Sequence, residues 1–107
     1  MLERQADLAR NALDKLIESN DAEKANVALE LMVKLVDSMI QNPEKSKYRK
    51  VKKGSKALQR KVLCLDGGLQ ALVGIGFRED VDFFVHEMPT QELMDMLTVL
   101  YVFSMMF

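Results

Sequence analysis

The chain has 107 residues, 49% of them apolar and 29% charged, a size and composition that exclude intrinsic disorder and predict one domain with one core. Its formal net charge of −1 does not by itself favour any class of charged partner. The single cysteine excludes a disulfide within the chain, and because no signal-peptide pattern occurs we expect a reducing compartment, the cytoplasm with the nucleus as an alternative.

Apolar residues spaced three and four positions apart predict two amphipathic helices before residue 43. The stripe of the first helix consists of Leu2, Ala6, Ala9, Leu13, Leu16 and Ile17. The first helix ends near Asn20. The run Ser19-Asn20-Asp21 offers side-chain acceptors for the start of the second helix, with Glu23 three residues after Asn20 as in a capping box, and Pro43 ends this second helix. The second stripe consists of Ala25, Ala28, Met32, Leu35, Val36 and Met39. We expect the two helices to form an antiparallel hairpin.

Positive charge is concentrated in a basic segment, residues 45–61. It contains nine of the 15 basic residues and no acidic residue, whereas the rest of the chain has six basic and 16 acidic residues. The nine are Lys45, Lys47, Arg49, Lys50, Lys52, Lys53, Lys56, Arg60 and Lys61. Such a polarised charge distribution favours an anionic partner at one face of the molecule. The alternative is a solvated, lysine-rich loop.

Within the basic segment, helical spacing disappears from Lys47 to Lys53. Tyr48 and Val51 are the strand-forming residues of this stretch, so we predict a short, charged edge strand. Turn signals follow at Gly54-Ser55, where Ser55 provides an N-cap. The next helix is short, and its apolar residues are Leu58, Val62 and Leu63.

A further short helix is predicted to begin at Asp66, whose side chain can cap it. Its buried face consists of Leu69, Leu72, Val73 and Ile75. Gly76 provides the left-handed C-terminal position, because glycine adopts positive φ without a steric penalty. We expect Phe77, which follows, to enter the core.

The last part of the chain predicts a strand and a helix. Residues 82–87 alternate weakly in polarity and should pair with the first strand, and a helix restarts at Pro89-Thr90. Twelve of the fifteen residues from Leu93 to Phe107 are apolar, a run too short for a membrane span of about 20 residues, which predicts a buried C-terminal helix. The alternative is a homodimer through this helix, with contacts from Tyr101, Phe103, Met105, Met106 and Phe107.

The residues that catalysis and metal binding require are scarce. A base or nucleophile must be held against a second polar group, and the chain has one histidine and one cysteine. Cys64 lies between Leu63 and Leu65, so we expect an inert core thiol. His86 lies in a predicted strand, where a surface or hydrogen-bonded histidine is the ordinary outcome. We therefore expect a binding module with no enzyme activity, no cofactor and no metal site.

A pattern in residues 42–77 resembles the signature of PUB domains. The matching residues are Asn42-Pro43-Glu44-Lys45-Ser46-Lys47-Tyr48-Arg49-Lys50-Val51-Lys52, then Leu58, Val62, Gly67 and Ile75-Gly76-Phe77. The resemblance covers roughly residues 28–90 and is closest to the module of a UBX-domain cofactor. It implies a single domain over residues 1–107 with an α+β fold, mostly helical, around a small antiparallel sheet of two or three strands.

The resemblance also implies a partner. PUB domains bind the acidic C-terminal tail of the AAA+ ATPase valosin-containing protein, which ends in an aromatic anchor, and they act as adaptors in ubiquitin-linked protein quality control, including endoplasmic-reticulum-associated degradation. By position, the implied tail-binding residues are Ser38, Tyr48, Lys52, Lys53, Ser55 and Leu58. Many relatives have asparagine at the first and fifth of these positions and phenylalanine at the last. A supporting basic patch consists of Lys45, Lys47, Arg49, Lys50 and Lys56.

A lysine-rich patch is also compatible with nucleic-acid binding. Tyr48 is the one aromatic residue in the basic segment, so the patch lacks a stacking platform. The acidic remainder of the chain would repel a long polyanion. We therefore expect a protein tail, bound with micromolar affinity, rather than a nucleic acid.

Overall fold

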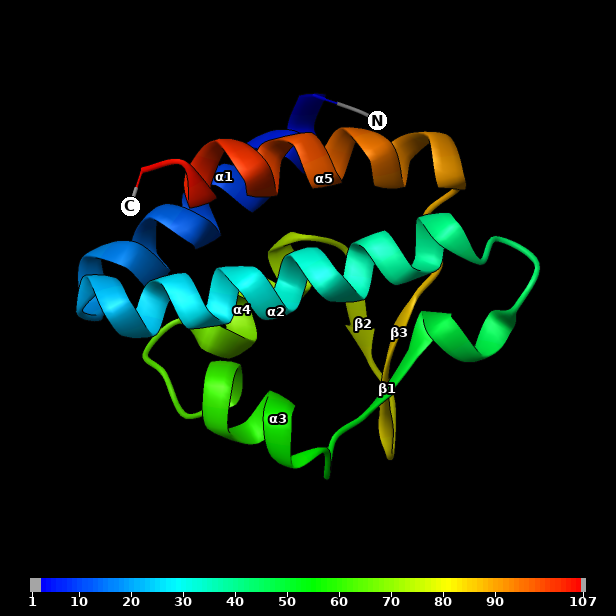
Figure 1. Ribbon diagram of the computed structural model, residues 1–107, viewed down its shortest axis with the longest axis horizontal. Coiled ribbons are helices and arrows are strands. Elements are labelled where there is room, and N and C mark those ends of the chain that lie inside the picture. The colour runs from blue at the N-terminus through cyan, green and yellow to red at the C-terminus, as the bar shows by residue number, and fades with distance from the viewer. Residues whose placement is uncertain (1–2, 107) are drawn as a thin grey trace.

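A computed structural model of the chain describes residues 3–106 (Figure 1). The helices and strands of this part, in chain order, are α1 Glu3–Ser19, α2 Ala22–Gln41, the 3-10 helix η1 Ser46–Arg49, β1 Lys50–Lys52, α3 Lys56–Leu58, the π-helix η2 Gln59–Leu63, α4 Gly68–Gly74, β2 Phe77–Glu79, β3 Phe83–His86 and α5 Thr90–Ser104. The predicted α+β class, mostly helical with a small antiparallel sheet, is confirmed.

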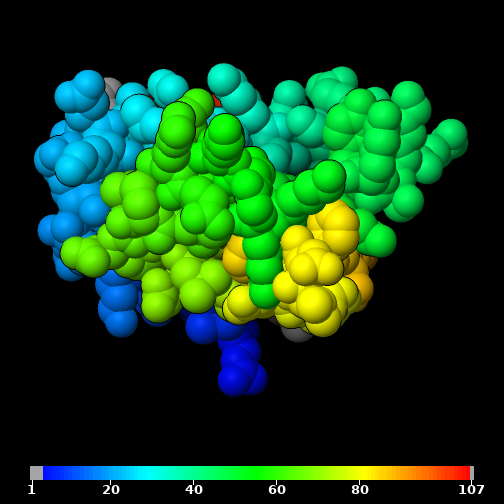
Figure 2. All heavy atoms as spheres, turned by 90° about the horizontal axis from the view of Figure 1, so that it is seen from below, coloured from blue at the N-terminus to red at the C-terminus, as the bar shows by residue number. Residues whose placement is uncertain are grey.

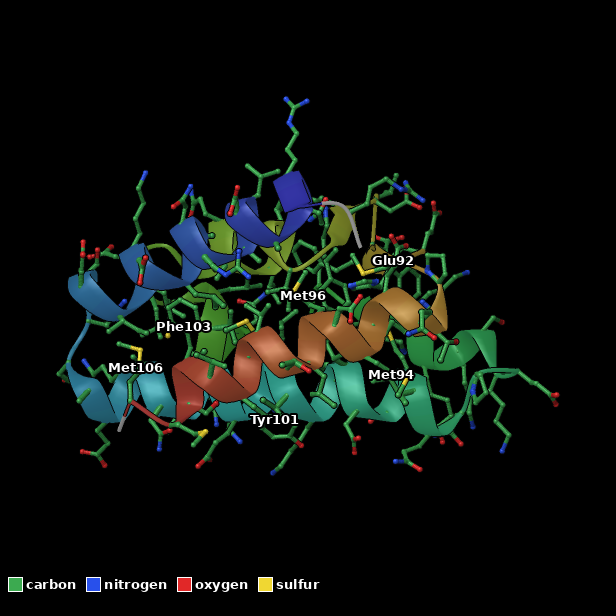
Figure 3. All side chains as sticks on the ribbon, turned by 90° about the horizontal axis from the view of Figure 1, so that it is seen from above. Glu92, Met94, Met96, Tyr101, Phe103 and Met106 are labelled. Carbon is green, nitrogen blue, oxygen red and sulfur yellow. The ribbon has the colours of Figure 1, made fainter. Side chains whose placement is uncertain are left out.

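The long helices lie above and in front of the short elements (Figure 1). α1 and α2 run in opposite directions, but α2 packs mainly against α5 and α1 packs mainly against α4. Viewed from above, α5 lies between them (Figure 3). The predicted antiparallel hairpin is therefore present, but its two helices touch only slightly, because the C-terminal helix α5 packs against both of them.

The sheet has three antiparallel strands in the order β1-β3-β2. In the β1–β3 register, Val51 lies opposite Phe84, so the predicted edge strand and its pairing with the second strand are confirmed. The predicted strand over residues 47–53 is too long, because η1 occupies its first part and the Tyr48 N–H donates to the Lys45 carbonyl at 3.2 Å. β2, which begins at Phe77, adds a third strand.

The helix caps agree with the prediction only in part. Within the predicted run Ser19-Asn20-Asp21, Asp21 caps α2 by accepting a hydrogen bond from the Lys24 N–H at 2.9 Å, so the capping-box role of Asn20 is wrong. The Asn20 side-chain amide instead donates to the carbonyls of Leu16 and Asp66, at 2.8 and 2.9 Å, and so links the end of α1 to the loop before α4. The helix α4 starts after Gly67, which has a φ of +80°. No side chain caps this helix, so the predicted Asp66 cap is wrong.

The buried face of α4 differs from the predicted one. Leu72 and Ile75 are buried as expected, but Leu69 and Val73 are exposed. The cause is Gly74, at which a Cβ atom would lie 2.8 Å from the Ala12 Cβ atom, so that α4 approaches α1 along its glycine and alanine face. Cys64 is also exposed, which corrects the expected core thiol.

The C-terminal helix α5 is buried along one side. Leu93, Met96, Val99, Leu100 and Phe103 belong to the core, whereas Met94, Tyr101, Val102, Met105 and Met106 are exposed. Figure 3 shows the two sides, with Met96 and Phe103 facing α1 and Tyr101 above α2. Phe103 is therefore not available to a second chain in this fold, and Phe107 lies outside the described residues. No helix in the described part is long and apolar enough to span a membrane.

His86 connects the sheet to the end of α4. It is 1% exposed, and its Nε2 lies 2.9 Å from the Ile75 carbonyl oxygen, while Nδ1 accepts a hydrogen bond from the Met88 N–H at 3.4 Å. These partners require a neutral ring with the proton on Nε2. The neighbouring Gly76 has a φ of +116°, and its missing side chain leaves the space that the ring occupies.

We predict that Gly76→Ala destabilises the fold by at least about 2 kcal/mol, because a methyl group adds strain at positive φ and would lie 2.6 Å from the His86 Nε2 atom. Gly54→Ala is the matched control, since no heavy atom lies within 4 Å of its Cβ position and its φ is not positive. It should change the unfolding free energy by less than about 0.5 kcal/mol. Urea denaturation measures both, and equal effects would contradict the account of Gly76.

We predict that stability falls as the pH decreases below about 6.5, the ordinary pKa of histidine. Burial lowers the pKa of His86, and the nearby Arg49 charge lowers it further, although the Ile75 hydrogen bond acts in the opposite direction. The unfolded chain therefore binds a proton before the folded chain does, and stability is lost between pH 6.5 and the lower pKa of the folded state. His86→Gln should remove this component in denaturation curves recorded from pH 7.5 to 5.5, and an unchanged pH dependence would contradict it.

Candidate functional site

A groove lies between the C-terminal half of α2 and the stretch from η1 to the start of α3. It has a volume of about 380 Å³, within the range of ligand pockets. Its lining residues are Leu35, Ser38, Lys47, Tyr48, Lys50, Val51, Lys52, Gly54 and Ser55. In the view from below, the green atoms of the basic segment spread over this face of the molecule (Figure 2). We call this feature the basic groove.

A hydrogen-bonded turn fixes one end of the basic groove. The Ser55 N–H donates to the Lys52 carbonyl at 3.0 Å, and the Lys53 N–H donates to the Asp82 carbonyl at 3.0 Å. The Gln59 side-chain amide donates to the Lys53 carbonyl at 2.7 Å. The turn is therefore attached both to the loop before β3 and to the helix that follows, so its side chains have defined positions.

The groove combines an apolar wall with unpaired positive charge. Tyr48 is half-buried and packs against the core, and the Lys47 ammonium lies 5.3 Å from the centre of its ring. Lys50 and Lys52 are exposed on the edge strand. None of these three lysines forms an ion pair within residues 3–106. Their charges are therefore available to an anionic ligand.

Two serine hydroxyls in the groove have opposite hydrogen-bonding roles. The Ser38 hydroxyl donates to the Lys34 carbonyl at 2.7 Å, so it has acceptor capacity left for a ligand. The Ser55 hydroxyl accepts a long bond, 3.4 Å, from the Leu58 N–H, which leaves its proton free to donate. The turn end of the groove is therefore rich in donors, and the α2 end presents an acceptor.

Several residues that the sequence suggested for the site lie elsewhere. Leu58 is 1% exposed and belongs to the core, and the Lys53 ammonium pairs with the Glu79 carboxylate at 2.8 Å. The Arg49 guanidinium donates to the Met88 carbonyl and so links η1 to the chain before α5. The remaining two, Lys45 and Lys56, are exposed but do not line the groove. Ser38, Tyr48, Lys52 and Ser55, with Lys47 and Lys50, are brought together.

Sequence reasoning missed three lining residues, Leu35, Val51 and Gly54. Leu35 was placed in the core stripe of the second helix, although it lies one turn before Ser38 and is half-buried. Val51 stands between two lysines on the edge strand, where the alternation of side chains predicts that it faces away from them, so nothing in the sequence signalled its place in the groove. Gly54 is exposed and leaves the mouth of the groove open.

A larger cavity, of about 510 Å³, lies between the start of α2 and the π-helix. Its lining residues are Asn20, Asp21, Glu23, Lys24, Val27, Arg60, Lys61, Cys64, Leu65 and Asp66. Charges of both signs are mixed there, which gives no preference for an anion. Within residues 3–106, no group of His, Cys, Asp or Glu side chains could hold a metal ion. The basic groove therefore remains the candidate site.

Comparison with known families identifies the family of this chain. The family model of the PUB domain matches residues 22–100, which include every residue that lines the groove. The chain belongs to the PUB domain family. The resemblance in the sequence pattern is thereby confirmed, and membership makes this domain a non-catalytic interaction module.

The PUB domain is similar to part of UBX domain-containing protein 6 from several mammals. It is 30% identical over 61 residues to the human and bovine proteins and 28% identical to the mouse protein. These matches cover 57% of the chain but 14% of the length of each relative. The similarity is therefore to one domain of a much longer protein.

Proposed function

We propose that this PUB domain binds the acidic C-terminal tail of the AAA+ ATPase valosin-containing protein in the basic groove, as an adaptor in ubiquitin-linked protein quality control. We place this work in the cytoplasm, with the nucleus as a second location, and include endoplasmic-reticulum-associated degradation. The observation that carries the proposal is the combination, in one groove, of three unpaired lysines with the half-buried ring of Tyr48.

Both halves of that combination are needed. Exposed ion pairs contribute about 0–1 kcal/mol each, so the lysines mainly accelerate encounter and fix orientation. The lifetime of the complex depends on an apolar side chain of the tail that loses its contact with water on binding. Leu35, Tyr48 and Val51 provide the surface for that side chain. We expect micromolar affinity, on the order of −7 to −8 kcal/mol, because a short tail buries little area.

The tail's parts match different parts of the groove. Its aromatic anchor packs against Tyr48, and its carboxylates lie near Lys52 and the free Ser55 proton. Lys47 and Lys50 attract the acidic residues further along the tail. The assignment departs from the sequence-based one in leaving Lys53 and Leu58 out of direct contact.

We predict that Tyr48→Ala weakens binding by at least about tenfold, equivalent to about 1.4 kcal/mol, because the tail's anchor loses its aromatic neighbour. Lys52→Glu should weaken it by about three- to tenfold through charge reversal at the groove. Isothermal titration calorimetry with a synthetic peptide of the tail measures both changes.

Lys61→Glu is the matched control for the charge reversal, since Lys61 belongs to the basic segment but lines the larger cavity instead of the basic groove. At about 0.15 M salt, charges beyond roughly 8 Å are largely screened, so this variant should bind the peptide within about twofold of the unchanged chain. Equal losses in Lys52→Glu and Lys61→Glu would contradict a local site and indicate attraction by overall charge.

We also predict that raising the salt concentration from about 0.05 to 0.5 M weakens tail binding, because salt screens the lysine charges. Lys52→Glu should show a smaller dependence on salt than the unchanged chain, and Tyr48→Ala should show the same dependence, since it removes no charge. Titrations at four salt concentrations test this. A salt-independent affinity would refute the role of the lysines.

A further inference from the structure

Ser55 differs from the helical hydroxyl groups that donate within their own helix. The hydroxyls of Ser38, Thr98 and Ser104 each donate to the carbonyl four residues earlier in a helix. Ser55 lies in the turn between the edge strand β1 and α3, is half-buried, and donates to no partner within residues 3–106. Its hydroxyl can react once the turn opens locally, which breaks the backbone bonds from Ser55 to Lys52 and from Lys53 to Asp82.

The charge around Ser55 is that of a substrate for a kinase with an acidic substrate-binding groove. Lys52 and Lys53 precede it by three and two residues, and no acidic residue lies within residues 45–61. The Lys53–Glu79 pair is at the surface, so it offers little resistance to competing carboxylates of a kinase. Ser46, the other serine of the basic segment, follows Pro43, Glu44 and one lysine, and it does not line the groove.

We propose that Ser55 is a phosphorylation site and that its modification closes the basic groove to acidic tails. The inference rests on the proposed function. The Ser55 Oγ attacks the γ-phosphorus of ATP, the bond from that phosphorus to the bridging oxygen of ADP breaks, and the hydroxyl proton passes to the kinase's base. The product is a phosphate monoester on the groove wall, with ADP as the leaving group.

The phosphate acts through charge at the place where a ligand's carboxylates bind. It adds about −1.5 to −2 charges beside a groove whose lining includes three lysines, so most of the attraction for an acidic tail is cancelled. It also removes the Ser55 hydroxyl proton, which was free to donate. The Leu58 N–H still has an oxygen to donate to, so α3 keeps its cap and the fold is retained.

The first experiment tests the site. The chain is incubated with MgATP and the catalytic subunit of cyclic-AMP-dependent protein kinase, a kinase that prefers basic substrates, and the modified residue is located by peptide mass spectrometry. We expect modification at Ser55, its loss in Ser55→Ala and its retention in Ser46→Ala. Absence of phosphate at Ser55 would overturn the assignment of the site.

The second experiment tests the effect and does not depend on the kinase. Phosphoserine is incorporated in place of Ser55 by genetic code expansion, with incorporation in place of the exposed Ser19, at the end of α1, as the matched control. Calorimetry with the tail peptide should show at least about tenfold weaker binding for the first protein and a change within about twofold for the second, with circular dichroism showing that both remain folded.

The outcomes separate this inference from the proposed function. Tail binding by the unmodified chain together with unchanged affinity after modification at Ser55 would overturn the inference alone. No binding by the unmodified chain would overturn the proposed function and the inference with it. Equal weakening by the two phosphoserines would also overturn the inference, because the effect would then come from overall charge.

Discussion

The basic groove depends on the pairing of β1 with the central strand β3. Three residues of β1 are paired, and bonds on both sides hold this short strand in place. On one side the Arg49 guanidinium contacts the Met88 carbonyl, and on the other the Lys53 N–H contacts the Asp82 carbonyl. Without these attachments the basic segment would be a solvated loop, with no fixed relation between its lysines and α2.

The pairing of β1 with β3 keeps several like charges close together. Lys50 and Lys52 lie on one strand, and Lys47 lies on the adjoining 3-10 helix, with no ion pair to any described residue. Mutual repulsion reduces the stability of the free domain, and an acidic ligand relieves it. Two basic side chains of the same segment, Arg49 and Lys53, are bonded within the fold, so only part of its charge is left without a partner in the described residues.

The helices were largely predictable from the sequence because each long stripe repeats every three to four residues. The helix caps and the packing partners of the helices were not predictable, because they depend on residues that are distant in the chain. Asn20 has a good capping sequence, yet its amide bonds to Asp66, and the exposure of Val73 follows from the approach of Gly74 to α1. For the site, the charge pattern indicated the right segment. It did not indicate that Lys53 forms an ion pair while Lys52 does not, because that depends on where the fold places Glu79.

The hydroxyls of Ser38 and Ser55 make the two ends of the groove different in hydrogen bonding. Because the Ser38 proton is bonded to the Lys34 carbonyl, the α2 end offers an acceptor, while Ser55 and Lys52 offer donors at the other end. A peptide that ends in carboxylates and also presents backbone N–H groups can match both ends at once. The phosphates of a nucleic acid are acceptors only, so by themselves they match only the donor end. The groove's hydrogen-bonding pattern thus adds a directional requirement that the lysines alone would not impose.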